Sequence, residues 1–72
     1  MNEDKIYKSI GHQVKILRES KGLTQERLAE MSGLSLDYIG KIEVCINKPG
    51  LRALIKISNA LDVELKELFS FK

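Results

Sequence analysis

The residues of this chain that could do chemistry are hydrogen-bond donors and acceptors rather than nucleophiles or metal ligands. His12 is the only histidine, and no acid stands at helical spacing from it to complete a catalytic or metal-binding pair. Cys45 is the only cysteine, which excludes an intramolecular disulfide and an all-cysteine zinc site. The sequence also has no glycine-rich phosphate loop and no zinc motif. We therefore expect no enzyme, no metal and no cofactor.

Polar side chains suited to hydrogen bonding are concentrated in residues 24–43, which read TQERLAEMSGLSLDYIGKIE. Two short helices are expected here, joined by a tight turn at residues 32–34. Thr24 and Ser35 are the candidate N-terminal caps of these helices. Ala29 is small where the two helices must approach each other closely. Such a helix-turn-helix holds its second helix away from the body, where the helix can enter a major groove.

The elements that position this segment are predicted from the spacing of apolar residues. Apolar positions recur every three or four residues on both sides of the segment, which predicts a helix before it and another after it. These positions are Ile6, Ile10, Val14 and Leu17 before the segment, and Leu51, Leu54, Ile57 and Leu61 after it. Gly22 supplies a left-handed stop, residues 44–50 form a turn, Asp62 or Val63 ends the fourth helix, and residues 65–69 suit a short fifth. The pattern predicts a compact all-α domain of five helices.

The length and charge of the chain narrow the possible functions. Seventy-two residues make one small domain, without room for a sizeable catalytic cleft or a separate ligand-sensing domain. The net charge of +2 is weak evidence for a nucleic-acid partner, although residues 5–21 are richer in base. No apolar run approaches the roughly 18 residues of a membrane span, and the start of the chain has no apolar core for a signal peptide. We expect a cytoplasmic protein with no membrane and no small-molecule ligand.

The central segment and its surroundings resemble a known family. GLTQERLAEMSGLSLDYIGKIE, with VKILRESK before it and LIKISNALDV after it, is similar to the Cro/C1-type helix-turn-helix regulators, the phage-repressor-like XRE family. The resemblance runs from about Ile10 to Phe69. It implies a single λ-repressor-like domain over residues 1–72, with the helix-turn-helix at about 24–43. It also implies a sequence-specific transcription regulator that binds double-stranded DNA as a homodimer on a near-palindromic operator, without choosing between repression and activation.

The resemblance makes the helix after Ser35 the recognition helix, with Ile39 and Ile42 turned inward. Lys41 can donate to guanine or to a phosphate. Asp37 can accept from cytosine N4, or it can simply favour the positive end of the helix dipole. The predicted DNA-binding residues are Thr24, Gln25, Ser35, Leu36, Asp37, Tyr38, Gly40, Lys41, Asn47, Lys48 and Arg52.

Four of these residues receive specific roles. By the resemblance, Gln25 lies against the DNA backbone and braces the recognition helix. Leu36 could touch a thymine methyl, while Tyr38 packs its ring and offers its hydroxyl to a phosphate. Gly40 costs about 1 kcal/mol relative to alanine inside a helix. A close approach of the DNA would explain that cost, and so would neutral drift at an exposed site.

The resemblance also predicts an ion pair and exposes one departure from the family pattern. Arg18 and Glu43 match a pair that joins the first and third helices, which gives them a structural role. A glycine usually follows the family's Ile-Glu shortly, but here residues 44–47 are Val-Cys-Ile-Asn. Asn47 is then the best candidate for the left-handed residue of the loop, and Cys45 is expected to be a half-buried apolar residue rather than a redox switch.

The C-terminal residues Leu65, Leu68, Phe69 and Phe71 are predicted to form a dimer interface, with Ile6 or Tyr7 beside them. In the alternative, Leu65 and Phe69 complete the core of the monomer and Phe71 frays into solvent.

A second function also stays open, a protein–protein interaction module that uses the same fold without reading DNA. The weak net charge and the apolar residues 44–46 favour that alternative.

Overall fold

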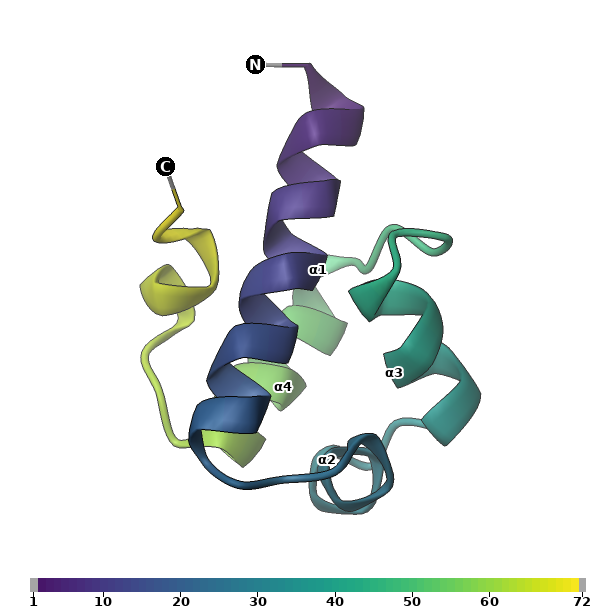
Figure 1. Cartoon of the computed structure of the whole chain (residues 1–72), viewed down its shortest axis with the longest axis vertical. Helices are drawn as coiled ribbons and strands as arrows, with labels where there is room; N and C mark the ends of the chain where they lie inside the picture. The colour runs from purple at the N-terminus through teal and green to yellow at the C-terminus, as the bar shows by residue number, and fades with distance from the viewer. Residues whose placement is uncertain (1, 72) are drawn as a thin grey trace.

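The computed structural model describes residues 2–71, which contain four α-helices and one short 3-10 helix and no strand. The elements are α1 (Glu3–Ser20), α2 (Gln25–Ser32), α3 (Leu36–Glu43), α4 (Leu51–Leu61) and η1 (Leu65–Phe69). In Figure 1, α1 runs along the molecule, α3 and η1 flank it, α2 lies below and α4 lies behind. The predicted all-α fold is confirmed, with one difference: the fifth helix is a 3-10 helix.

The two helices of the helix-turn-helix begin at the predicted caps. Thr24 Oγ1 accepts a hydrogen bond from the Arg27 backbone N–H at 3.0 Å. Ser35 Oγ accepts in the same way from the Tyr38 N–H at 3.0 Å. Each hydroxyl satisfies a backbone donor that has no partner within its own helix. Both hydroxyl groups therefore form hydrogen bonds within the protein in the absence of any ligand.

Left-handed residues end the elements close to where the sequence placed them. Gly22, with φ of 71°, follows α1, and Gly33, with φ of 75°, ends α2. Asp62 ends α4 with φ of 57°. Glycine suits the turn at Gly33, because a residue without a Cβ adopts this left-handed conformation without the strain that other residues incur.

The core lies between α1 and the other helices and draws on every element. Its fully buried side chains include Ile39 and Ile42 of α3, so the predicted inward face of that helix is confirmed. The core residues are Ile10, Val14, Leu28, Ala29, Ile39, Ile42, Leu54, Ile57, Leu61 and Leu68. Most of the periodic residues identified from the sequence are members of this set.

Leu68 was predicted to lie in a dimer interface, whereas the structure places its side chain in the core of the monomer. Its side chain is 0% exposed and belongs to the core, so it offers no surface for a contact in this fold. In η1, Leu68 is the residue that turns inward, whereas Phe69 is 43% exposed. Of the residues in η1, only Leu68 is fully buried.

The loop after α3 corrects a second prediction. Cys45, with φ of 64°, is the left-handed residue, and Asn47 is not. The Lys41 carbonyl at the end of α3 accepts hydrogen bonds from the N–H groups of Ile46 and Asn47. That capture forces the chain to reverse at Cys45, whatever its side chain prefers. A non-glycine residue in this conformation costs about 1–2 kcal/mol.

Candidate nucleic-acid interface

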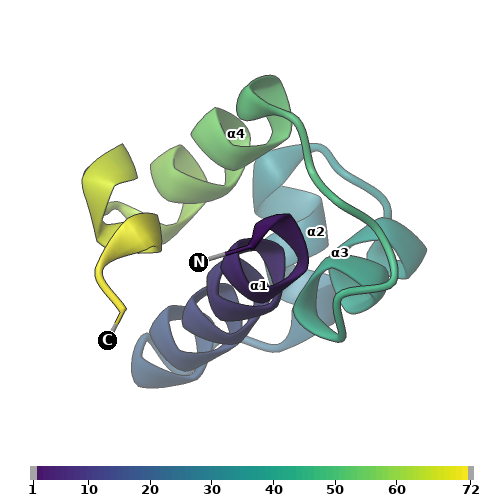
Figure 2. The same cartoon turned by 90° about the horizontal axis from the view of Figure 1, so that it is seen from above.

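The position of α3 is fixed by a close contact with α1. Figure 2 shows α3 and η1 on opposite sides of α1. Gly11 of α1 faces the Ile42 carbonyl, and a Cβ at Gly11 would collide with that oxygen. Since Gly11 is buried in the middle of α1, the missing side chain lets the two helix backbones approach. The contact leaves the opposite face of α3 directed outward.

The outward face of α3 is a mixed apolar and charged surface. Leu36 is 45% exposed and Asp37 is also exposed, whereas Gly40 and Lys41 are half-buried. Lys41 Nζ lies 3.0 Å from Asp37 Oδ2, so the two charges on this face pair with each other. The pair is open to solvent, which makes it weak. A base or phosphate can therefore compete for either partner.

A buried ion pair anchors the end of α3 to α1. Arg18 Nε donates to Glu43 Oε2 at 2.7 Å, and Nη2 donates to Oε1 at 3.1 Å. Arg18 Nη1 also donates to the Leu23 carbonyl at 2.7 Å. The hydrogen bonds to Glu43 raise the pKa of Arg18 above its usual range. The structure thus forms the pair that the sequence proposed between the first and third helices.

Gln25 joins this network from the start of α2. Its Nε2 donates to Glu43 Oε1 at 2.9 Å, so Gln25 links the first residue of α2 to the last residue of α3. This bond provides the brace that the family resemblance implied. A Cβ at Gly40 would lie 3.7 Å from Gln25 Oε1, an ordinary contact. Packing within the chain therefore does not require glycine at that position.

Lys48 is exposed, but its ammonium group is paired with two carboxylates of the same chain. Its Nζ lies 2.8 Å from Glu3 Oε2 and 2.8 Å from Asp4 Oδ1, and 5.7 Å from the centre of the Tyr7 ring. The bonds to these acids raise the pKa of Lys48, and the bond to Lys48 lowers the pKa of Asp4. Lys48 ties the loop to α1 and must leave these acids to bind a phosphate. Asn47 is half-buried in the same loop.

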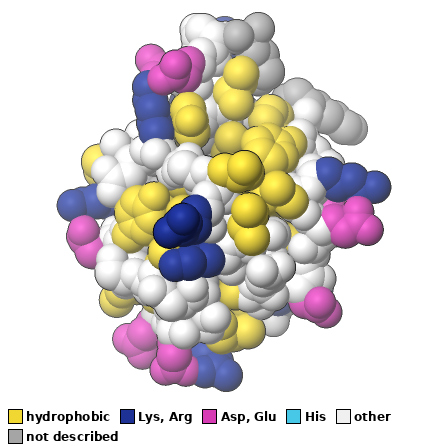
Figure 3. Space-filling view, turned by 180° about the vertical axis from the view of Figure 1, so that it is seen from behind, with side chains coloured by type: hydrophobic (Ala, Val, Ile, Leu, Met, Phe, Trp, Pro, Cys, Tyr) yellow, Lys and Arg dark blue, Asp and Glu magenta, His cyan; other side chains and the backbone are white. Residues whose placement is uncertain are grey.

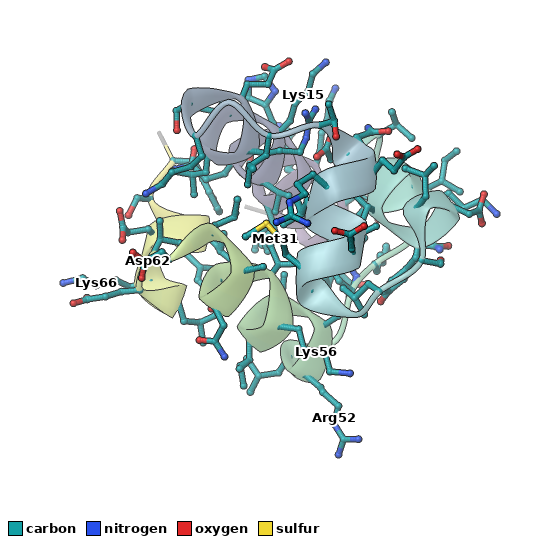
Figure 4. All side chains as sticks on the ribbon, turned by 90° about the horizontal axis from the view of Figure 1, so that it is seen from below. Lys15, Met31, Arg52, Lys56, Asp62 and Lys66 are labelled. Atoms are coloured by element: carbon teal, nitrogen blue, oxygen red, sulfur yellow. The ribbon has the colours of Figure 1, made fainter. Side chains whose placement is uncertain are left out.

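Arg52 and Lys56 form a cationic pair that the sequence analysis found only in part. Both side chains are exposed and extend outward from α4 on the same side of the molecule (Figure 4). Within residues 2–71, neither lies within ion-pair distance of a carboxylate. Arg52 was predicted to bind DNA, but Lys56 was missed. The signal was available, because Lys56 stands one helical turn after Arg52.

An apolar surface also lies outside the helix-turn-helix. Leu51 is 60% exposed, Ile55 is 41% exposed and Phe69 is 43% exposed. Leu51 and Phe69 border an open groove with Ile6 and Tyr7 of α1. Figure 3 shows apolar side chains gathered on the face of the molecule that carries α4. Phe69, Ile6 and Tyr7 were proposed from the sequence for contacts between chains, but Leu51 was not. Of the other candidates, Leu65 and Phe71 are half-buried.

The described residues contain no membrane-spanning helix and no cluster of metal-binding side chains. No helix in residues 2–71 combines the length and the apolar character needed to cross a bilayer. Over the same residues, no three side chains of histidine, cysteine, aspartate or glutamate gather where they could hold a metal ion.

Comparison with known proteins identifies relatives of this arrangement. The helix-turn-helix family model (HTH_3) matches residues 14–68. The HTH-type transcriptional regulator SlrR of Bacillus subtilis is 41% identical over 61 residues, which cover 83% of this chain and 40% of SlrR. The immunity repressor protein of Bacillus phage phi105 is 32% identical over 83% of this chain and 42% of the repressor. This chain thus spans less than half the length of either relative.

A solved structure matches over nearly its full length. The restriction-modification controller protein C.AhdI from Aeromonas hydrophila is 40% identical, with a TM-score of 0.86. The match covers 88% of this chain and 96% of the controller. The agreement includes the arrangement of the helices as well as the sequence.

Proposed function

The chain belongs to the HTH_3 family of helix-turn-helix transcriptional regulators, which are not enzymes. We propose that it binds double-stranded DNA sequence-specifically, as a homodimer on a near-palindromic operator. The proposal rests on how α3 is held, with one face fixed to the protein and the other face directed outward. Its inner face is locked to α1 and α2 through Gly11 and the Arg18–Glu43–Gln25 network. Its outer face is free to enter a major groove.

In this proposal, Lys41 and Asp37 read base edges, and Leu36 meets a thymine methyl group. Lys41 donates to guanine and Asp37 accepts from cytosine N4, which requires their mutual pair to open on DNA. Gln25 retains its bond to Glu43 and offers its second amide hydrogen to a phosphate. Thr24 and Ser35 contribute through the backbone geometry that their caps set. Gly40 lets the DNA approach the helix, Asn47 lies beside the backbone, and the hydroxyl of Tyr38 bonds to a phosphate.

The second copy in the dimer occupies the apolar surface around Leu51 and Phe69. Leu51 projects beside the groove that Ile6 and Tyr7 border, so each copy offers both a projecting side chain and a hollow. Glu3 also lines this groove, and Lys48 neutralises it. A twofold contact between two such surfaces therefore brings no unpaired like charges together. The half-sites are expected about one turn of DNA, roughly 34 Å, apart.

Sedimentation and DNA binding together test this proposal. The wild type should be a dimer when bound to an operator selected from random duplexes, and the selected consensus should be a near-palindrome. Leu51→Ser should weaken dimerisation and operator binding together while leaving the helical circular dichroism spectrum intact, because the side chain is mostly exposed. Met31→Ser is the matched control, since Met31 is 44% exposed on α2. A wild type that binds its operator as a monomer would remove the dimer from the proposal.

A second candidate function is binding to another protein without DNA readout. The loop after α3 supports it, because Val44 and Ile46 are 64% and 68% exposed beside the proposed DNA-binding face. A mobility shift on random duplex DNA at several salt concentrations separates the two candidates. Salt-dependent binding supports the first, and no binding even at low salt supports the second.

A further inference from the structure

We propose that Lys56, together with Arg52, holds a DNA backbone phosphate on α4, so that the DNA-binding surface continues beyond the helix-turn-helix. This inference rests on the proposed DNA-binding function and adds a site to it. The two cations stand one helical turn apart and extend to the same side of the molecule (Figure 4). Their ligand is a phosphodiester of the DNA backbone.

Within the described residues, Arg52 and Lys56 are free to exchange counterions for phosphate. The other basic side chains close to the helix-turn-helix surface are occupied: Lys41 pairs with Asp37, Arg27 with Glu30, and Lys48 with Glu3 and Asp4. No carboxylate of residues 2–71 pairs with Arg52 or Lys56. A phosphate at this site displaces only mobile counterions, which gives the full electrostatic gain.

The two cations also lie next to α3. Arg52 and Lys56 border a shallow hollow of about 270 Å³ together with Tyr38 of α3 and Leu34 of the turn before it. A strand whose groove receives α3 therefore passes this hollow. The residues that line it are Leu34, Tyr38, Gly50, Arg52, Ala53 and Lys56.

A lysine at this position suits contact with a phosphate rather than with a base. The ammonium of lysine is a flexible, strongly hydrated point charge, which suits a phosphate oxygen better than the patterned edge of a base. The contact from Lys56 therefore adds affinity for any duplex and does not change the preferred sequence. This separates its role from the role proposed for Lys41.

The test compares Lys56→Ala with Lys15→Ala in the whole protein, by fluorescence anisotropy on random duplex DNA. Lys15 is an exposed lysine of α1 on the opposite side of the molecule, so its removal changes the net charge equally (Figure 4). Lys56→Ala should lower the slope of log affinity against log salt by about one. The ratio of wild-type to variant affinity should then change about 3.5-fold between about 50 and 200 mM salt. Lys15→Ala should leave the slope unchanged, and Lys56→Arg should retain it.

Equal slopes for Lys56→Ala, Lys15→Ala and the wild type, all binding DNA, would overturn the Lys56 site and leave the proposed function standing. A shifted consensus in Lys56→Ala would also overturn it, because a phosphate contact carries no base preference. If the wild type bound no duplex at low salt, the proposed function and this inference would fall together. A circular dichroism spectrum of each variant confirms that it is folded.

Discussion

Two ion-pair clusters join α1 to the helix-turn-helix half of the protein, and they differ mainly in burial. Arg18 near the end of α1 holds Glu43 of α3, with side chains only 9% and 1% exposed. Lys48 in the loop holds Glu3 and Asp4 at the start of α1, with exposures of 44%, 71% and 83%. The distances are alike, 2.7 Å and 2.8 Å. The difference in exposure to solvent therefore distinguishes the buried pair, which fixes α3, from the exposed cluster, which a ligand can open.

The largest effect is expected from breaking the buried cluster. Arg18→Met leaves the Glu43 carboxylate in the protein interior with only Gln25 as a partner. The loss of stability should be about 3 kcal/mol, the lower end for a buried pair, because water lies close in so small a domain. Removing both partners with Arg18→Met and Glu43→Leu should recover part of this loss. Thermal unfolding of the two single variants and the double variant measures the coupling, and simple additivity would show that the pair does not couple.

A similar but smaller loss is expected where α1 and α3 touch. Gly11→Ala places a Cβ against the Ile42 carbonyl, and neither helix backbone can move away without disturbing the core. We expect destabilisation by about 1–3 kcal/mol. Gly40→Ala is the matched control, because its Cβ meets only an ordinary contact, and it should gain up to about 1 kcal/mol from helix propensity. Chemical denaturation measures both, and equal effects would contradict the proposed close contact.

The smallest effect is expected at the exposed cluster. Lys48 lowers the pKa of Asp4 in the folded protein below its usual value near 3.8. The stabilisation from this pair is therefore present above that usual pKa and is lost as the pH falls through the lowered pKa. In an NMR titration, Lys48→Ala should return the Asp4 midpoint to its usual value while changing the melting temperature little. An Asp4 midpoint that does not move would show that the pair is not formed in solution.

The contrast between the clusters also explains what the sequence could predict. The caps at Thr24 and Ser35 and the inward face of α3 follow from neighbouring residues, so they were predicted correctly. The Arg18–Glu43 pair was identified through its resemblance to a family pattern, since no local signal links residues 25 positions apart. The acids that hold Lys48 come from the start of the chain, and nothing in the loop pointed to them.

The two corrected residues show a different limit. Cys45 is left-handed because the chain must turn there for Ile46 and Asn47 to reach the Lys41 carbonyl. Asparagine adopts the left-handed conformation more readily than cysteine, which is why Asn47 was predicted. The hydrogen bonds at the end of α3 outweigh that conformational preference. Leu68 lies among several apolar residues in a segment too short to show a helical period, and the sequence could not tell which of them turns inward.

The most direct test of the account is a selection of binding sites from random DNA by the wild type and by Lys41→Ala. We expect a near-palindromic consensus for the wild type. In Lys41→Ala, preference should be lost at one position in each half-site, at a cost of about 1–3 kcal/mol there, while the other positions persist. Lys15→Ala, on the far side of the molecule, should return the wild-type consensus. An unchanged consensus in Lys41→Ala, or no consensus for the wild type, would contradict sequence reading by the outward face of α3.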